Sequence, residues 1–146
     1  MDKDIFVDNN IAKNFCNPLD PEYKKFIIWL LTDGFLVVSN KILGEYNRTC
    51  SHSYSSTNIA IIVNKLLQEG RLKKYGNPEL KKIVFKKSIV RRLRSNFKDH
   101  DHIRLVILSD RKYALVRDDN LIHDINSFPG INAVAVKRPQ DLPYSK

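Results

Sequence analysis

Short, wholly apolar runs recur along the chain, separated by longer stretches of mixed character. They lie at residues 5–7, 35–38, 113–116 and 133–136, with a weaker run at 83–85. A strand that is apolar at every position is typical of a sheet covered on both faces, as parallel sheets usually are. The pattern therefore predicts four buried strands, and a further short strand at 83–85.

The stretches between these runs have the spacing and start signals of helices. The expected helices cover residues 21–32, 41–50, 59–67, 103–108 and 120–126, with a shorter one at 88–93. Side chains of the type that cap helix N-termini stand before several of them, and we expect Asp20, Ser39, Thr57 and Ser88 to act in this way.

Strands that alternate with helices indicate an α/β fold. We expect a three-layer α/β/α sandwich with a central, mostly parallel, twisted sheet. The 146 residues suit a single domain spanning 1–146. The segment from about residue 137 holds two prolines, and we expect it to be a loose C-terminal tail.

Composition excludes several classes of protein. An apolar fraction of 42% excludes a disordered chain, and 2 cysteines cannot build a disulfide framework or a zinc knuckle. The longest apolar run, residues 26–31, is far shorter than the roughly 20 residues needed to span a bilayer. Residues 1–8 lack the apolar core of a secretion signal. These features favour a cytoplasmic protein with reduced thiols and no membrane partner.

The net charge of +9 favours a polyanionic partner, and the charge is concentrated between residues 73 and 98, where Glu79 is the only acidic residue. Tyr75, Phe85 and Phe97 lie among these cations, an arrangement suited to a single-stranded backbone and its bases. A solvated face, or a docking surface for an acidic partner, is the alternative. The candidate RNA-binding residues are Lys81, Lys82, Lys86, Lys87, Arg91, Arg92 and Arg94.

Acidic residues stand where several of the expected strands end or helices begin. Asp8 follows the first strand directly, and Glu45 lies one turn into the helix after the second. Asp118 and Asp119 follow the third of the four apolar strands, and Asp99 and Asp101 lie at the start of the helix that leads back to that strand. The long basic connection before this helix would have to return the chain to the site. Ligands of open parallel sheets bind at the carboxyl ends of strands, and gathered carboxylates share a proton or bind a hard cation such as Mg²⁺ or Mn²⁺.

Four segments together resemble the motifs of PIN-domain nucleases. They are IFVDNN at residues 5–10, VVSNKILGEY at 37–46, DHI at 101–103 and LVRDDNL at 115–121. Their order matches the family, and the resemblance covers residues 4–136. It implies a compact α/β/α domain whose acidic pocket binds Mg²⁺ or Mn²⁺ and hydrolyses RNA phosphodiester bonds.

The resemblance also implies roles for particular residues. Asp8, Glu45, Asp101 and Asp119 would form the acidic quartet, with Asp8 and Asp101 as direct metal ligands. Glu45 would ligate the metal or hold its water, and Asp119 would complete the side of a second metal. Asn10 matches a polar position that hydrogen-bonds the first motif.

Some positions leave alternatives open. The family usually has Ser or Thr where this chain has Arg117, so Asp118 could replace Asp119, and Arg117 could dampen metal binding. Asp99 competes in the same way with Asp101, and Asp124 is a further acidic candidate.

Two other arrangements of reactive side chains are weaker. His100 and His102 alternate with aspartates, but no second cluster completes a zinc site. Cys50 and His52 are not a nucleophile and base by spacing alone.

We therefore expect a metal-dependent endoribonuclease. A stand-alone domain of this kind resembles the toxin of a toxin–antitoxin pair, with an antitoxin protein or a second copy as partner. The alternative is a catalytically weak or inactive module that binds RNA or protein.

Overall fold

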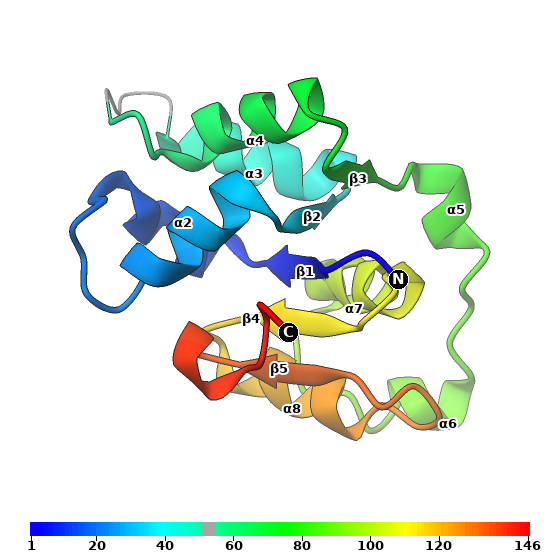
Figure 1. Ribbon diagram of the computed structural model, residues 1–146. Coiled ribbons are helices and arrows are strands. Elements are labelled where there is room, and N and C mark those ends of the chain that lie inside the picture. Colours follow the sequence, from blue (N-terminus) through cyan, green and yellow to red (C-terminus); the bar gives the residue numbers. More distant parts are fainter. Residues whose placement is uncertain (51–54) are drawn as a thin grey trace.

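A five-stranded parallel sheet forms the centre of the computed structural model, which describes residues 1–50 and 55–146 (Figure 1). The strands lie in the order β3-β2-β1-β4-β5, and every neighbouring pair is parallel. Their bounds are β1 Asp4–Val7, β2 Phe35–Val38, β3 Leu72–Lys74, β4 Tyr113–Leu115 and β5 Val134–Val136.

Helices cover the two faces of this sheet. They are α1 Asn9–Ala12, α2 Lys24–Thr32, α3 Asn40–Cys50, α4 Ile59–Gln68, α5 Asn77–Lys81, α6 Lys87–Val90, α7 His100–Leu108 and α8 Asp119–Ser127. Three short 3₁₀ turns accompany them: η1 Lys13–Cys16, η2 Phe97–Asp99 and η3 Pro139–Asp141. On one side α4 contacts α2, β2 and β3, and on the other α7 contacts β1, β2 and α8. The expected three-layer α/β/α sandwich is confirmed.

The four apolar runs are strands, but the fifth strand is not where the pattern placed it. Residues 83–85 form no strand, and the side chain of Phe85 is buried in the core instead. The fifth strand is β3, at the edge of the sheet beside β2. An edge strand is covered only in part, so its residues need not be apolar, and the Leu-Lys-Lys sequence of β3 gave no signal of burial.

Helix starts follow the cap signals in part. Ser39 accepts a hydrogen bond from the Ile42 amide at 3.2 Å and caps α3 as predicted. Asp20 instead accepts from the Glu22 amide within a turn, and α2 begins only at Lys24. The helix over 21–32 is therefore three residues shorter at its start.

Two other cap predictions are wrong. Asn58, not Thr57, caps α4 by accepting a hydrogen bond from the Ile61 amide at 3.0 Å. Ser88 lies inside α6, which begins at Lys87. The Cys50–His52 pair, together with Ser51 and Ser53, lies outside the residues whose side chains are described.

The segment after residue 137 was expected to be loose, yet it packs against the core. The ring of Tyr144 lies 5.0 Å from that of Phe26 and 4.9 Å from that of Trp29, in edge-on contacts. Leu142 is buried. These aromatic contacts, which proline content alone does not reveal, hold the end of the chain.

Among the described residues, no helix has the length and apolar character needed to cross a membrane.

The basic connection between β3 and α7 runs along α7 from its end toward its start. The Tyr75 hydroxyl donates a hydrogen bond to the Leu108 carbonyl at the end of α7. The Arg104 guanidinium donates to the Ile83 carbonyl, one turn from the start. This path returns the chain to the carboxyl end of β1, so that α7 begins there, as the sequence required.

Candidate metal centre

A polar cavity lies where β1 and β4 end. The strand order reverses between these two strands, and open parallel sheets bind ligands at such a point. The cavity has a volume of about 220 Å³. It is lined by Asp8, Asn9, Asn10, Glu45, Asn96, Lys98, Asp99, Asp118 and Leu121. Four carboxylates from four separate segments therefore meet in one cavity.

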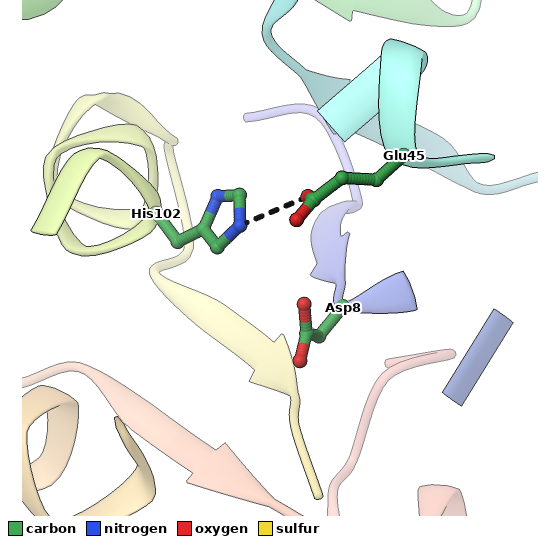
Figure 2. Close-up of side chains that lie close together, drawn as sticks. All are labelled: Asp8, Glu45 and His102. Atoms are coloured by element: carbon green, nitrogen blue, oxygen red, sulfur yellow. Dashed lines mark ion pairs between the residues drawn. The ribbon is translucent and has the colours of Figure 1, made fainter. Parts of the chain in front are cut away.

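Asp8, Glu45 and His102 form the tightest group at this cavity (Figure 2). Each offers one ligand atom, and these atoms all lie within 4.8 Å of one another. β1 supplies Asp8 at its end, α3 supplies Glu45, and α7 supplies His102. The three side chains point toward one another from different elements, which is the arrangement of a metal-ligand set.

His102 is buried, with 1% of its surface exposed, and its ring faces Glu45. Its Nε2 lies 3.1 Å from Glu45 Oε2, an ion-pair distance. Among the described residues neither ring nitrogen has a hydrogen-bond partner of regular geometry, and the same is true of Glu45 Oε2. His102 Nε2 and Glu45 Oε2 face each other, whereas His102 Nδ1 has no partner among the described residues. Buried polar atoms without partners are rare, so this group has bonding capacity that a ligand could use.

Burial raises the pKa of the Asp8 carboxyl group. The charge of His102 and a hydrogen bond from the Asn9 amide act in the opposite direction, and the negative charges of Glu45 and Asp99 raise the pKa further. The charged form of Asp8 is thus disfavoured in the protein without a cation. A bound divalent cation would remove this penalty.

The pKa of Glu45 is lowered even though burial opposes its ionisation. The hydrogen-bonding and charge of His102 have the larger combined effect, with smaller contributions from Lys41 and Arg48. Asp8 and Glu45 therefore differ. Positively charged neighbours favour the ionised form of Glu45, whereas the surroundings of Asp8 favour its protonated form or the binding of a cation.

Asp4, at the other end of β1, shows what a structural carboxylate looks like in this fold. Its side chain is fully buried but satisfied, because it accepts hydrogen bonds from the Asp110 and Arg111 amides at 2.8 and 3.0 Å. Lys73 Nζ adds an ion pair at 3.3 Å. Asp8 has no Lys or Arg in ion-pair contact among the described residues, so the two ends of β1 carry aspartates with opposite roles.

Two of the four residues expected in the acidic quartet lie elsewhere. Asp101 pairs with Arg104 on the outside of α7 at 3.0 Å. Asp119 is 84% exposed and pairs with Lys137 at 2.7 Å. The cavity instead contains Asp99 and Asp118, the two residues that the sequence had left as alternatives.

Helix geometry explains why Asp118 lies in the cavity instead of Asp119, and Asp99 instead of Asp101. Asp118 caps α8 by accepting hydrogen bonds from the Asn120 and Leu121 amides, which holds it at the cavity edge while Asp119 turns outward. Asp99 and Asp101 are two positions apart at the start of α7, and such residues point to opposite sides of a helix. His102 is three positions after Asp99 and shares its side.

The remaining candidates divide in the same way. Asn10 lines the cavity. Asp124 does not, since its buried carboxylate accepts hydrogen bonds from the Arg94 and Ser95 amides and from the Ser95 hydroxyl. It anchors the basic connection to α8. Arg117 lines a separate hollow and interacts with the Tyr23 hydroxyl, so the cavity is not the place where it acts.

The candidate RNA-binding cations are exposed. They lie on the connection before α7 and comprise Lys81, Lys82, Lys86, Lys87, Arg91, Arg92 and Arg94. Lys98, which the sequence placed at the end of this basic stretch but not in the site, lies at the cavity itself. A surface of free cations thus leads toward a cavity of carboxylates.

Sequence reasoning missed His102 and Asn9 as members of the site. His102 was considered only with His100 in a zinc site, and His100 instead packs against Phe97, with ring centres 5.4 Å apart. Asn9 lines the cavity, and its Oδ1 atom is buried without a hydrogen-bond partner in the described structure. The spacing of three residues between Asp99 and His102 was the signal that could have found the histidine.

The donor set fits a hard or borderline divalent cation. Carboxylate oxygens suit Mg²⁺ and Mn²⁺, and an imidazole nitrogen adds affinity for transition metals. The ligand atoms of Asp8, Glu45 and His102, all within 4.8 Å of one another, are the structural observation that supports this fit. Comparisons of the chain with protein-family models, with curated proteins and with solved structures find no match.

Proposed function

We propose that this protein is a metal-dependent endoribonuclease of the PIN type. The observation that carries the proposal is the cavity at the ends of β1 and β4, where Asp8, Glu45, Asp99 and Asp118 meet, together with the buried His102 that lies 3.1 Å from Glu45. The exposed cations of the neighbouring connection support a polyanionic substrate.

The side chains of the cavity have separable tasks. Asp8, Glu45 and His102 would hold the cation, while Asp99 and Asp118 would add negative charge in the same cavity. When bound, a divalent cation activates water and stabilises charge on the scissile phosphate. Lys98 lies in the same cavity and is suited to contact a phosphate oxygen.

The presence of His102 favours Mn²⁺ over Mg²⁺ as the cation. Mg²⁺ strongly prefers oxygen ligands, whereas imidazole suits transition metals. We expect His102→Gln to weaken Mn²⁺ binding more than Mg²⁺ binding.

The first experiment compares neighbouring aspartates that the structure separates. Asp118→Asn and Asp99→Asn should weaken Mn²⁺ binding by about 10-fold or more, the effect of altering groups around a metal. Asp119→Asn and Asp101→Asn remove only surface ion pairs and should leave the affinity nearly unchanged. Asparagine keeps the helix cap at position 118, so that variant is not expected to unfold. Calorimetric titration with Mn²⁺ measures all four.

Cleavage of a labelled RNA with Mn²⁺ or Mg²⁺ then tests the activity. Asp8→Asn should abolish cleavage, and Asp119→Asn should retain it. Cleavage by Asp8→Asn at the wild-type rate would remove the proposed mechanism, even if the metal site were real.

The biological setting follows from the resemblance alone. A toxin with a protein antitoxin, or a homodimer, remains our proposal for it. Ile28 on α2 and Ile61 and Leu67 on α4 are exposed apolar side chains that such a partner could cover. Light scattering on the purified chain measures whether it is a dimer.

The competing function is a non-catalytic RNA-binding module, which would bind RNA equally in EDTA and would show no Mn²⁺ site that depends on Asp8.

A further inference from the structure

Phe97 stands out among the aromatic residues of the described chain. It is 83% exposed, and within residues 1–49 and 55–146 it is the only aromatic among the strongly exposed large apolar side chains. The other two aromatics of the basic connection are occupied. Tyr75 is partly buried and donates to the Leu108 carbonyl, and Phe85 is buried under the Arg104 guanidinium, 4.3 Å from its ring centre.

The position of Phe97 ties it to the metal centre. The residues on both sides of it, Asn96 and Lys98, line the acidic cavity, and so does Asp99. The ring rests against the buried ring of His100, with centres 5.4 Å apart and planes tilted by 60°. The ring therefore packs against His100 on one side and is otherwise open to solvent, on a residue whose two neighbours in the sequence line the cavity.

The anchoring of this segment makes the ring a fixed platform. Asp124 accepts hydrogen bonds from the amides of Arg94 and Ser95, three and two positions before Phe97. The Asp99 amide donates to the Asn96 carbonyl and closes the 3₁₀ turn. A ring held in this way loses little freedom when another flat group stacks on it, which favours binding.

We propose that Phe97 is a stacking platform for a nucleobase of single-stranded RNA, one that lies beside the phosphate at the metal centre. The inference rests on the proposed function and specifies its substrate class. Lys98 and the cations of the connection contact the backbone, and Phe97 contacts a base. Nothing else in the described structure offers an exposed flat apolar face beside the cavity.

The strandedness follows from the geometry of bases. In a duplex each base is stacked within the helix, and its face is not available to a protein ring. Stacking on Phe97 needs an unpaired nucleotide. Because every base has a π-face, this contact is tolerant of sequence, so the site selects strandedness and not a particular base.

The test separates binding from catalysis. An Asp8→Asn background in EDTA prevents cleavage, and fluorescence anisotropy then measures binding of a labelled 12-nucleotide unstructured RNA and of the corresponding duplex. Adding Phe97→Ala should weaken binding of the single strand by about 5- to 150-fold, the range for loss of one stacked base, and leave duplex binding unchanged. Val84→Ala, at an equally exposed position of the same connection, is the matched control and should have no effect.

Two further readouts identify stacking specifically. The slope of log affinity against log salt should stay the same in Phe97→Ala, because the phosphate contacts remain. Phe97→Trp should retain affinity, and its fluorescence should change when RNA binds. The native tryptophan, Trp29, is only 7% exposed and is the single one in the chain, so it provides a nearly constant background.

Each outcome decides the matter. Unchanged single-strand affinity in Phe97→Ala overturns the platform, as does an equal loss for single strand and duplex. These results leave the proposed nuclease intact, since Mn²⁺ binding and cleavage are measured separately. If the Asp8→Asn protein binds neither RNA in EDTA, the platform is overturned, whereas the proposed nuclease is decided separately by Mn²⁺ binding and RNA cleavage of the wild type.

Discussion

Replacing Asp8 with Asn should separate stability from metal binding. Asp8 is buried beside Glu45 and Asp99, and burial raises its pKa because the charged carboxylate is poorly accommodated. Among the described residues, the regular hydrogen bond of its carboxylate is the one that it accepts from the Asn9 amide at 2.9 Å. Asparagine can accept the same bond without carrying the charge. Without metal at pH 7, Asp8→Asn should therefore be at least as stable as the wild type.

The pH dependence has a definite sign. The unfolded chain releases the Asp8 proton near the ordinary pKa of 3.8, whereas the folded chain retains it to higher pH. The contribution of Asp8 to stability is therefore present below 3.8 and is lost as pH rises through the folded-state pKa. The advantage of Asn over Asp should be absent in acid and should grow toward neutral pH.

Added Mn²⁺ should reverse the order of stability of the wild type and Asp8→Asn. A ligand that binds only the folded state at 100 times its dissociation constant adds about 2.7 kcal/mol. For a domain of this size that corresponds to a rise in Tm of roughly 10 °C. The wild type should show this gain with Mn²⁺, and Asp8→Asn should show almost none.

Urea unfolding in EDTA at acid and neutral pH measures the first effect, and thermal scans with Mn²⁺ measure the second. Asp4→Asn is the control, since it disrupts a buried and satisfied ion pair and should lose about 3–5 kcal/mol without metal. If Asp8→Asn were destabilised in EDTA to a similar extent, Asp8 would be a structural carboxylate and the reasoning would be refuted.

Two further substitutions test the framework around the site. Asp124→Ala leaves the Arg94 and Ser95 amides without their acceptor and should lower the free energy of unfolding in urea by about 2–4 kcal/mol. It should also weaken Mn²⁺ binding, because Asp99 follows this anchor in the chain. The exposed Asp119→Asn is its control, and an equally small effect in both variants would contradict the role of Asp124 as an anchor. Gly34→Ala would place a Cβ atom 2.7 Å from the Trp29 ring and should cost about 1–3 kcal/mol, with a changed near-ultraviolet circular dichroism of Trp29. An unaltered spectrum and midpoint would show that the ring yields without strain.

The layers of the fold could be predicted because burial on both faces leaves a direct mark on a strand. Ile5, Phe6 and Val7 are all fully buried, and the sequence shows nothing but apolar residues there. The edge strand β3 has no such mark, and the covering of Phe85 depends on contacts with distant segments. Register along an edge is set by tertiary packing, which local pattern does not contain.

The candidate site could be predicted to the right segments but not to the right side chains. Asp8 and Glu45 were correctly placed at one cavity, because strand ends determine where they lie. The choice between Asp118 and Asp119 depends on which one caps α8, and adjacent residues of a helix point about 100° apart. Spacing on the sequence identifies the segment, whereas the local backbone decides the direction.

The 3₁₀ turn before α7 has a consequence for how the protein would respond to its ligands. Phe97, Lys98 and Asp99 are consecutive, so in the proposed complex one short piece of backbone would carry a base contact, a phosphate contact and a carboxylate of the ion cavity. If either ligand orders these three residues, the other no longer has to, so each would raise the affinity for the other. Thermodynamic reciprocity makes the two factors equal. RNA affinities measured with a chelator would then be lower than those in the presence of Mn²⁺. Mn²⁺ affinities measured without RNA would likewise be lower than those of the RNA complex.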